Sequence, residues 1–198
     1  MDSAKWDERY ATSELIWTGR ANQFVEANLA DLVPGTAIDL GAGEGRNAVW
    51  LATRGWTATA VDFSQVGLDK ADQLAAEHDV EITTVRADAT TWQPDAPVDL
   101  VVLSYLQLPS EQQRVVLGHA ATWLNPGGTL FVIAHDRSNV EHGYGGPSSP
   151  DVCYTVGETV AALDALDVTT AEVAERQVDT LDGTTTALDT LVIALQPL

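Results

Sequence analysis

The chain has 198 residues, 45% of them hydrophobic, which suffices for the core of a single domain. Its 29 acidic and ten basic residues give a formal net charge of −19. Because nucleic-acid phosphates and anionic membranes are bound by clustered lysines and arginines, this charge argues against both kinds of partner.

The number of cysteines and the lack of long apolar runs indicate the cellular compartment of the protein. Cys153 is the only cysteine, so no intramolecular disulfide can form and a disulfide-stabilised secreted domain is not expected. Residues 1–8 lack the basic and apolar regions of a signal peptide, and no run of 18 apolar residues occurs. We therefore expect a cytoplasmic protein that has no membrane-spanning segment.

The first part of the chain precedes the regular pattern. Residues 6–22 mix aromatic and charged side chains without a helical period, whereas residues 22–32 place Phe24, Val25 and Leu29 near helical spacing. We expect an irregular segment, followed by a helix that caps the sheet.

An apolar strand and a glycine-rich loop form the most informative stretch. The strand at 36–40 passes directly into Gly41, Gly43 and Gly45, and a helical pattern follows. Glycine permits a sharp turn and lets the backbone approach a ligand that a Cβ atom would obstruct. The sequence therefore predicts a strand, a ligand-binding loop and a helix.

Strands and helices alternate through the middle of the chain, as in a parallel α/β sheet. The final stretch changes character, because two β-rich runs joined by a turn at Gly183 predict an antiparallel hairpin. One helix is expected to end at Gly55. The other expected helices are 65–78, 110–124 and 155–166, and the further strands are 57–61, 81–86, 98–103, 129–134, 172–179 and 187–195.

Three of the expected helices begin with residues that favour capping. Ser64 follows the second expected strand and can accept a hydrogen bond from the first turn of the next helix. Ser110 with Gln113, and Thr155 with Glu158, have the spacing of a capping box. We therefore expect these hydroxyl side chains to mark the helix starts.

Together these elements predict an α/β, Rossmann-like three-layer sandwich. Its seven-stranded, mostly parallel sheet ends in a C-terminal antiparallel hairpin. Ligands of such folds bind at the carboxyl ends of the strands, beside the point where the strand order reverses. The residues that directly follow the strands are therefore the candidates for the site.

The glycine spacing separates two ligand classes. The dinucleotide fingerprint requires a small residue where this chain has Arg46. With Asp39 two residues before its first glycine, the loop instead resembles motif I of the class I S-adenosylmethionine-dependent methyltransferases, and the likeness extends over residues 36–132. The resemblance implies S-adenosylmethionine as cofactor and S-adenosylhomocysteine as product. It also implies one domain, with a lid or cap helix in 1–32 and a catalytic core in 33–198.

Acidic residues at the strand ends suit this cofactor, which carries an ammonium, a sulfonium and a ribose diol but no phosphate. Asp62 lies nineteen positions after Gly43 and can accept both ribose hydroxyls, or it can act as an acid at a helix N-terminus. An unpaired carboxylate at Asp39, within an apolar strand, would be costly. The cofactor ammonium can offset that cost directly or through water.

Four further residues follow the second, third and fourth strands. Phe63 can lie against the adenine face or pack in the core. The resemblance implies that Asp88, with Ala89 after it, contacts the adenine amino group, although Asp88 also suits a turn. Tyr105 corresponds to the segment beneath the methionine arm, and packing is its alternative role.

The N-terminal segment has a likeness of its own. Trp6 to Tyr10, together with Trp17 to Asn22, resembles a small-molecule branch of the family that includes tellurite-resistance and thiopurine methyltransferase relatives. That resemblance implies that the segment folds over the cofactor, that Arg20 binds the cofactor carboxylate and that Trp17 covers the transfer site. A solvated position is the alternative for Arg20.

Methyl transfer from a sulfonium can depend largely on alignment, and a base helps when the acceptor must lose a proton. His135 directly follows a strand and is the candidate base, which Asp136 can orient. Ordinary polar roles in the following loop are the alternative for both residues. No cysteine and histidine set has zinc spacing, so no metal is expected.

We therefore predict an S-adenosylmethionine-dependent methyltransferase (EC 2.1.1.-) that acts on a small molecule. The acceptor atom and the oligomeric state do not follow from the sequence. A non-catalytic cofactor-binding sensor or partner subunit is an alternative, because its cofactor motifs would look the same. A nicotinamide oxidoreductase would share the sheet and the ribose acid, but Arg46 breaks its fingerprint.

Overall fold

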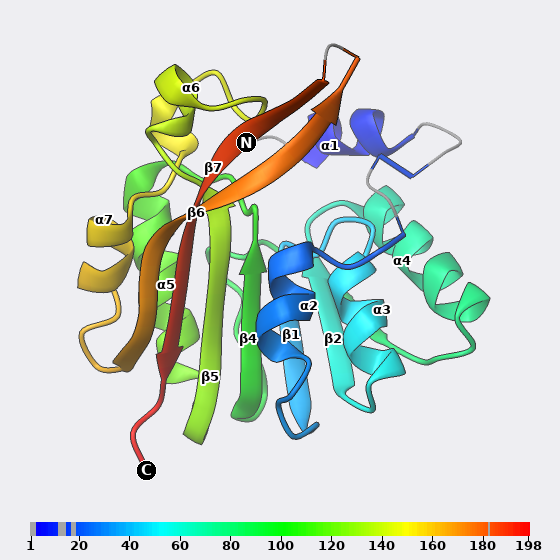
Figure 1. Ribbon diagram of the computed structural model, residues 1–198. Helices are drawn as coiled ribbons and strands as arrows, with labels where there is room; N and C mark the ends of the chain where they lie inside the picture. The colour runs from blue at the N-terminus through cyan, green and yellow to red at the C-terminus, as the bar shows by residue number, and fades with distance from the viewer. Residues whose placement is uncertain (1–2, 12–14, 17–18, 182) are drawn as a thin grey trace.

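The computed structural model describes residues 3–11, 15–16, 19–181 and 183–198. Seven strands form one sheet in the order β3-β2-β1-β4-β5-β7-β6, with helices on both faces (Figure 1). The strands are β1 (Thr36–Leu40), β2 (Thr57–Asp62), β3 (Thr83–Arg86), β4 (Val98–Ser104), β5 (Leu124–His135), β6 (Asp167–Thr180) and β7 (Gly183–Leu195). The helices are α1 (Ser3–Tyr10), α2 (Gln23–Leu29), α3 (Arg46–Thr53), α4 (Gln65–Glu77), α5 (Ser110–Thr122), α6 (Asn139–His142) and α7 (Val156–Ala161), with a short 3₁₀ helix at Pro150–Val152.

The strand directions confirm the predicted sheet. β1 pairs in parallel with β2 and β4, β2 with β3, and β4 with β5. β7 runs antiparallel to both of its neighbours, β5 and β6. Because β1 and β4 are neighbours in the sheet but not in the chain, the strand order reverses between them.

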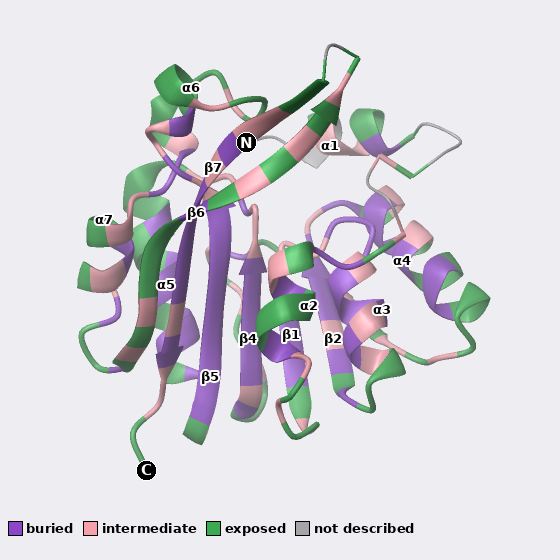
Figure 2. Cartoon of the chain, in the orientation of Figure 1, coloured by how far each residue is buried: buried purple, intermediate pink, exposed green. Residues whose placement is uncertain are grey.

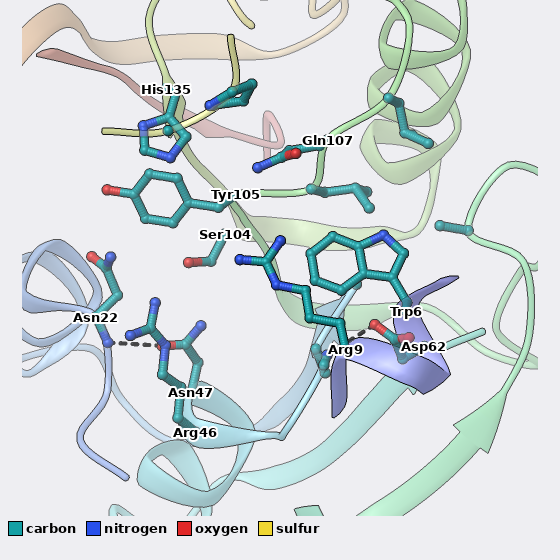
Figure 3. Close-up of a pocket in the computed structure, with 18 of the residues that line it drawn as sticks. Trp6, Arg9, Asn22, Arg46, Asn47, Asp62, Ser104, Tyr105, Gln107 and His135 are labelled. Carbon is teal, nitrogen blue, oxygen red and sulfur yellow. Dashed lines mark hydrogen bonds between the residues drawn. The ribbon is translucent and has the colours of Figure 1, made fainter. Parts of the chain in front are cut away.

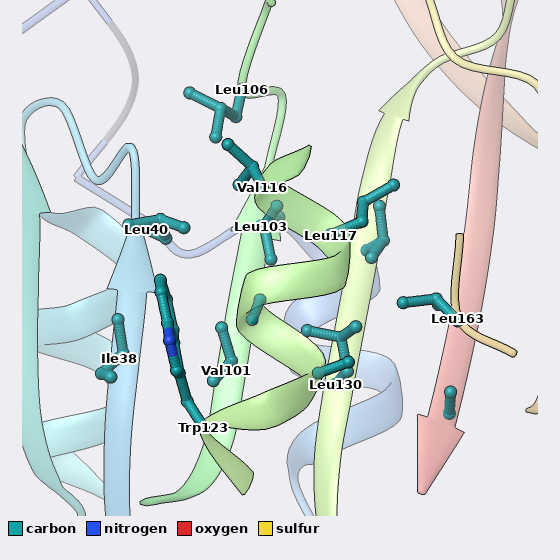
Figure 4. Close-up of a cluster of buried hydrophobic side chains, with 14 of the residues drawn as sticks. Ile38, Leu40, Val101, Leu103, Leu106, Val116, Leu117, Trp123, Leu130 and Leu163 are labelled. Carbon is teal, nitrogen blue, oxygen red and sulfur yellow. The ribbon is translucent and has the colours of Figure 1, made fainter. Parts of the chain in front are cut away.

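Apolar side chains are buried on both faces of the sheet. Along β4, Val101 and Leu103 belong to one cluster, while Leu100 and Val102 belong to the other. α5 and the segment after α7 cover the first face, and α2, α3 and α4 contribute to the second. Leu117 of α5 packs toward the strands in Figure 4. The central strands are buried along most of their length (Figure 2), which explains their uninterrupted apolar runs.

Two of the predicted helix caps are confirmed. The Ser64 hydroxyl accepts a hydrogen bond from the N–H of Gly67 at 3.1 Å, at the start of α4. The Thr155 hydroxyl accepts one from the N–H of Glu158 at 3.2 Å, at the start of α7. Each cap satisfies an amide that has no partner within its helix.

The predicted cap at Ser110 is wrong, because Ser110 is the first residue of α5 and not the residue before it. Pro109 takes the N-cap position, and its carbonyl accepts the N–H of Gln113 at 2.9 Å. The Ser110 hydroxyl instead lies 3.4 Å from the carbonyl oxygen of Asp151. The helix therefore starts without a side-chain cap.

The N-terminal segment is more regular than predicted. Residues 3–10 form helix α1, in which Trp6 and Tyr10 stack with their ring centroids 5.3 Å apart. Such contacts between residues four apart favour a helix. The helix is tied to the start of α4, where the Ser64 hydroxyl donates to Oδ1 of Asp7 at 2.5 Å. No helix among the described residues is long and apolar enough to cross a membrane.

Helices α3 and α4 approach each other closely at Gly45. This residue precedes α3 with a φ of 76°, in the left-handed region. A Cβ atom there would collide with Cβ of Ala71 on α4 and would lie 3.0 Å from Cα of Ala71. Glycine is therefore needed for the backbone conformation and for the contact between the helices.

We expect Gly45→Ala to lower the free energy of unfolding by about 2–5 kcal/mol, because it combines a left-handed backbone with overpacking against α4. Gly145→Ala is the matched control, since Gly145 has a φ of 68° and no described heavy atom lies within 4 Å of its Cβ position. The control should lose only about 1–2 kcal/mol. Chemical denaturation measures both changes, and equal losses would contradict a packing constraint at Gly45.

Candidate functional site

A cavity of about 1280 Å³ opens at the carboxyl edge of the sheet (Figure 3). Five strands contribute to its wall through residues at or just after their ends. These residues are Gly41 after β1, Asp62 on β2, Ala87 after β3, Ser104 on β4 and His135 on β5. Helix α1 and strand β6 supply further wall residues. The cavity therefore lies where the strand order predicts a ligand site.

The carboxylate of Asp62 holds the glycine loop. Gly41 and Gly43 line the cavity with φ values of 77° and 55°. The N–H of Gly43 donates to Oδ2 of Asp62 at 2.9 Å, and the N–H of Ser64 donates to Oδ1 at 2.8 Å. Asp62 thus joins the loop after β1 to the start of α4. Gly45 was predicted as a cofactor contact, but it is not on the cavity wall and instead begins α3.

The environment of Asp62 affects its charge. Burial raises the pKa of this carboxyl above its ordinary value, while the backbone N–H groups of Ser64 and Gly43 act in the opposite direction. The side chain is only 6% exposed, yet it lines the cavity. A ligand hydroxyl that donated to this carboxylate would add a further donor and further favour its charged form.

Asp39 was predicted to meet the cofactor ammonium directly or through water, and it does not line the cavity. Its side chain is 1% exposed, and Oδ2 accepts the N–H of Ala48 at 3.2 Å. Oδ1 has no hydrogen-bond partner among the described residues. Burial raises the pKa of Asp39 to about 7, although the N–H of Ala48 and the charge of Arg46 oppose this shift. The unsatisfied oxygen is consistent with a contact through water.

Three residues predicted to contact adenine lie on the same part of the cavity wall. Phe63, Asp88 and Ala89 line it at the carboxyl ends of β2 and β3. Oδ1 of Asp88 accepts hydrogen bonds from the N–H and the hydroxyl of Thr90, at 2.8 and 2.6 Å. Asp88 therefore forms a turn, which was predicted from the sequence as the alternative to a contact with adenine. This turn is compatible with a ligand contact, because these bonds use one of the two carboxylate oxygens.

Helix α1 and residues 20–22 close one side of the cavity. Trp6, Arg9 and Tyr10 line the wall, and the guanidinium carbon of Arg9 lies 4.9 Å from the ring centroid of Trp6. Farther along, the N–H of Ile16 donates to both carboxylate oxygens of Glu44, at 3.1 and 2.9 Å. Since Glu44 belongs to the glycine loop, the N-terminal segment is attached directly to that loop.

Arg20 lies on the cavity wall, where the family resemblance places a cofactor contact. No residue in the described part of the chain forms a hydrogen bond or an ion pair with its side chain. Nearby, the N–H of Asn22 donates to Oδ1 of Asn47 at 2.9 Å, which holds this segment against α3. Trp17, predicted to cover the transfer site, lies outside the described residues.

A buried carboxylate joins three side chains of the cavity wall near β5 and the hairpin. Oδ2 of Asp189, on β7, accepts hydrogen bonds from the Tyr105 hydroxyl and from Nε of Arg176, both at 2.7 Å. Nδ1 of His135 lies 3.3 Å from Oδ1 of Asp189, and neither atom forms a hydrogen bond with a described residue. Tyr105, Arg176 and His135 all line the cavity, whereas Asp189 is fully buried.

These partners keep Asp189 charged. Burial favours the neutral acid, but the nearby His135 and the hydrogen bonds from Arg176 and Tyr105 outweigh it and hold the pKa of Asp189 below its ordinary value. Burial and the charge of Asp189 raise the pKa of Tyr105, so its hydroxyl stays protonated and acts as a donor. Tyr105 also has a φ of 55°, which is uncommon for a bulky residue and marks a constrained position.

Asp136 does not orient His135, in contrast to the prediction. Asp136 is buried away from the cavity, and its carboxylate accepts hydrogen bonds from the N–H and hydroxyl of Ser138 at 2.9 and 2.6 Å and from the Thr190 hydroxyl at 2.6 Å. Successive side chains of an extended chain point to opposite sides, which separates Asp136 from its neighbour. Asp189 takes the orienting position, because it lies opposite His135 in the β5–β7 register.

Sequence reasoning missed Asp189 and Arg176 because both lie within the hairpin and not after a parallel strand. One signal was present: Asp189 interrupts the apolar run at 187–195, as Asp39 interrupts the run at 36–40. An acid within a buried strand requires partners. Only the register of the folded sheet identifies His135 as one of them.

The fold and the cavity can be compared with solved structures. The N-methyltransferase NodS from Bradyrhizobium japonicum WM9, in complex with S-adenosylhomocysteine, superposes with a TM-score of 0.75 at 16% identity, covering 100% of both chains. This likeness concerns the fold. The chain therefore has the fold of this N-methyltransferase, with the glycine loop and the cavity at the carboxyl ends of its strands.

Sequence comparison finds similarity in the central part of the chain. Residues 37–128 match the family model of a methyltransferase domain. The ribosomal RNA small subunit methyltransferase C of Alcanivorax borkumensis is 31% identical over 108 residues, which are 52% of this chain and 33% of the relative. The cypemycin N-terminal methyltransferase of Streptomyces sp is 31% identical over 126 residues, 62% of this chain and 50% of the relative. The chain therefore spans half or less of the length of these curated relatives.

The buried carboxyl of Asp39 predicts a pH effect on stability. Because its pKa rises to about 7 on folding, the folded chain binds this proton more tightly than the unfolded chain, and the contribution of Asp39 to stability falls as pH rises from about 4 to about 7. We expect Asp39→Asn to be more stable than the wild type at pH 8, by about 1–4 kcal/mol, with a smaller difference at pH 5. Urea denaturation at the two pH values measures this change.

Asp95→Asn, at an exposed turn, is the control and should stay within about 0.5 kcal/mol of the wild type at both pH values. A loss of stability in Asp39→Asn at pH 8 would contradict the account, because it would show that the charged carboxylate is stabilised in the folded state.

Proposed function

We propose that the chain transfers the methyl group of S-adenosylmethionine to a small-molecule acceptor and releases S-adenosylhomocysteine. One observation carries the proposal: the glycine loop and the buried carboxylate of Asp62 meet in a cavity at the carboxyl ends of the strands. There the backbone can approach a nucleoside, and the carboxylate can accept its ribose hydroxyls. The cavity volume of about 1280 Å³ exceeds the roughly 300–1,000 Å³ of usual ligand pockets, which leaves room for cofactor and acceptor together.

The wall residues fit the parts of this cofactor. Asp62 is proposed to bind the ribose diol, and Phe63 and Asp88, with Ala89, to contact the adenine. Arg20 lies on the wall without a described partner, which suits it to the carboxylate of the cofactor. These assignments combine positions on the cavity wall with the family resemblance of the strand-end residues.

The methionine end of the cofactor fits a second group of residues. Tyr105 lies on the cavity wall and is held by Asp189, so it can support the methionine arm in one position. The unsatisfied Oδ1 of Asp39 is proposed to bind the cofactor ammonium through water. Gly41 and Gly43 supply the backbone beside this arm. A role for Trp17 as a cover stays a prediction.

The chain contributes mainly alignment to the reaction. The cofactor supplies a methyl group on a sulfonium, which is a good leaving group. Holding the two reactants in line can supply roughly 7–11 kcal/mol in well-oriented systems. The rigid elements around the cavity suit this task, because the wall side chains come from strand ends and from helices that are anchored by Asp62 and Ser64.

His135 is the proposed base for an acceptor that must lose a proton. Its Nδ1 faces Asp189 at 3.3 Å, which leaves Nε2 as the atom that can take the proton. Asp189 stays charged among its donors, so it also stabilises the imidazole once that group is protonated. In this proposal Asp189 is a positioning residue that acts through His135.

The physical evidence favours a small acceptor over RNA. A formal charge of −19 opposes contacts to a phosphate backbone. The match to the ribosomal RNA methyltransferase covers 33% of that relative, so the substrate of the relative does not transfer to this chain. Cys153 is a buried free thiol, which suits a reducing compartment, and we propose the cytoplasm.

Asp62→Ala should weaken the binding of S-adenosylhomocysteine by more than about tenfold, because it removes the acceptor of the ribose hydroxyls and the anchor of Gly43. Isothermal calorimetry measures the affinity. Asp95→Ala, at an exposed turn, is the matched control and should bind as the wild type does.

An analogue of S-adenosylhomocysteine without ribose hydroxyls separates the two effects of this variant. The wild type should bind that analogue more weakly, and the additional loss caused by Asp62→Ala should become smaller for it. Wild-type affinity for S-adenosylhomocysteine in Asp62→Ala would contradict the assigned site.

Once a screen for S-adenosylhomocysteine release has found a proton-bearing acceptor, His135→Gln should lower kcat by about 10²–10⁴. The affinity for S-adenosylhomocysteine should stay nearly unchanged. Asp189→Asn should lower kcat with little change in the affinity for S-adenosylhomocysteine, because the imidazole of His135 loses its positioning carboxylate. His119→Gln, at an exposed position on α5, is the control. Full activity of His135→Gln would exclude this base.

A further inference from the structure

The cavity wall differs in charge from the rest of the molecule. Among the residues that the structure describes, five of the ten basic residues of the chain and three of its 29 acidic residues line it. The wall therefore has a formal charge of +2, whereas all other residues together have −21. In so acidic a chain, this distribution concentrates positive charge at the place where ligands bind.

The basic residues of the wall are all arginines, and only the fold brings them together. They lie on α1, before α2, at the start of α3, at the end of β3 and on β6. They are Arg9, Arg20, Arg46, Arg86 and Arg176. In Figure 3 the side chains of Arg9 and Arg46 point toward the part of the cavity that Tyr105 lines. Convergence from five separate segments indicates a binding surface.

The proposed cofactor accounts for few of these charges. It carries one carboxylate, which is assigned to Arg20, and its sulfonium is itself a cation. Arg86 lies at the adenine end, where its Nε donates to a backbone carbonyl at 3.4 Å. Arg9, Arg46 and Arg176 therefore line the cavity without a matching anionic group on the cofactor.

Arg176 is well placed to bind an anion. Its Nε is fixed by the Asp189 carboxylate at 2.7 Å and by the Tyr105 hydroxyl at 3.1 Å. Within the part of the chain that the structure describes, its two terminal nitrogens donate to no other group. A guanidinium held at Nε presents these nitrogens as a fork that matches a carboxylate or a phosphate. Because Asp189 also contacts His135, the fork lies beside the proposed base.

Arg46 adds a second positive charge near Arg176. Burial lowers the pKa of Arg46, and the charge of Arg176 lowers it further, whereas Tyr105 and Asp39 act in the opposite direction. Asp189 beside Arg176, and Asp39 and Glu44 near Arg46, offset part of the repulsion between the two guanidinium groups, and an anion at the fork of Arg176 would offset more of it.

We propose that the methyl acceptor carries an anionic group, a carboxylate or a phosphate, which binds to the fork of Arg176 with Arg46 nearby. The proposal rests on the methyltransferase function proposed above and adds the chemical class of the acceptor. The anionic group holds the acceptor beside His135. Its charge also offsets the repulsion between the arginines and the cationic sulfonium.

A matched pair of probes tests this proposal on the full chain loaded with S-adenosylhomocysteine. The probes are 4-hydroxybenzoate and 4-hydroxybenzamide, which have nearly the same shape but differ in charge. Calorimetry or ligand-observed NMR should show that the carboxylate binds at least about tenfold more tightly than the amide. Equal affinities, or no binding of the carboxylate at millimolar concentration, would overturn the proposal.

Binding of S-adenosylhomocysteine, which precedes the probe measurements, tests the proposed function separately. A chain that does not bind S-adenosylhomocysteine would contradict the methyltransferase proposal. A chain that binds it but does not prefer the carboxylate would contradict only the class of acceptor.

Arg176→Gln locates the anion site, and Arg114→Gln is the matched control at an exposed position on α5, outside the cavity. Arg176→Gln should reduce the preference for the carboxylate at least about fivefold, while the affinity for S-adenosylhomocysteine stays within about twofold. Arg114→Gln should keep the full preference. Since Arg176→Gln removes a donor from Asp189, Arg176→Lys provides a second variant that keeps the charge without the fork. An unchanged preference in both Arg176 variants would overturn the proposal.

Discussion

The carboxylate of Asp62 is the contact on which the candidate site depends. It accepts one N–H from the glycine loop and one from Ser64, the residue that caps α4. Breaking either bond would leave a buried polar group without a partner, so the loop and the helix keep a fixed relation. The Ser64 hydroxyl extends the connection to Asp7 on α1. One carboxylate thus links the strand ends, a helix start and the N-terminal cover of the cavity.

A second carboxylate organises the other part of the cavity. Asp189 lies on β7, and the hairpin of β6 and β7 extends beyond the central strands at the edge where the cavity opens (Figure 1). Its carboxylate holds Tyr105, Arg176 and His135 together, so one buried group connects the support of the methionine arm, the anion fork and the proposed base. In our account Asp62 binds the cofactor, and Asp189 positions the residues that act in the transfer to the acceptor.

Local sequence patterns predicted the sheet, and they pointed to the glycine loop and Asp62, which meet at the cavity. Apolar runs and glycines gave the strands and the loop, and an acid after β2 gave Asp62, because each signal lies within a few residues. Contacts between distant segments were harder to predict. Asp136 follows His135 in the chain but points away from it, whereas Asp189 meets it through an antiparallel register. The depth of Asp39 below the wall and the convergence of five arginines also emerge only from the folded chain.

A crystal structure of the chain with S-adenosylhomocysteine tests the central claim most directly. Our account predicts that both ribose hydroxyls lie within hydrogen-bond distance of the Asp62 carboxylate, with the adenine beside Phe63 and the sulfur on the side of Tyr105 and His135. A nucleoside bound elsewhere, or a ribose that makes no contact with Asp62, would contradict it.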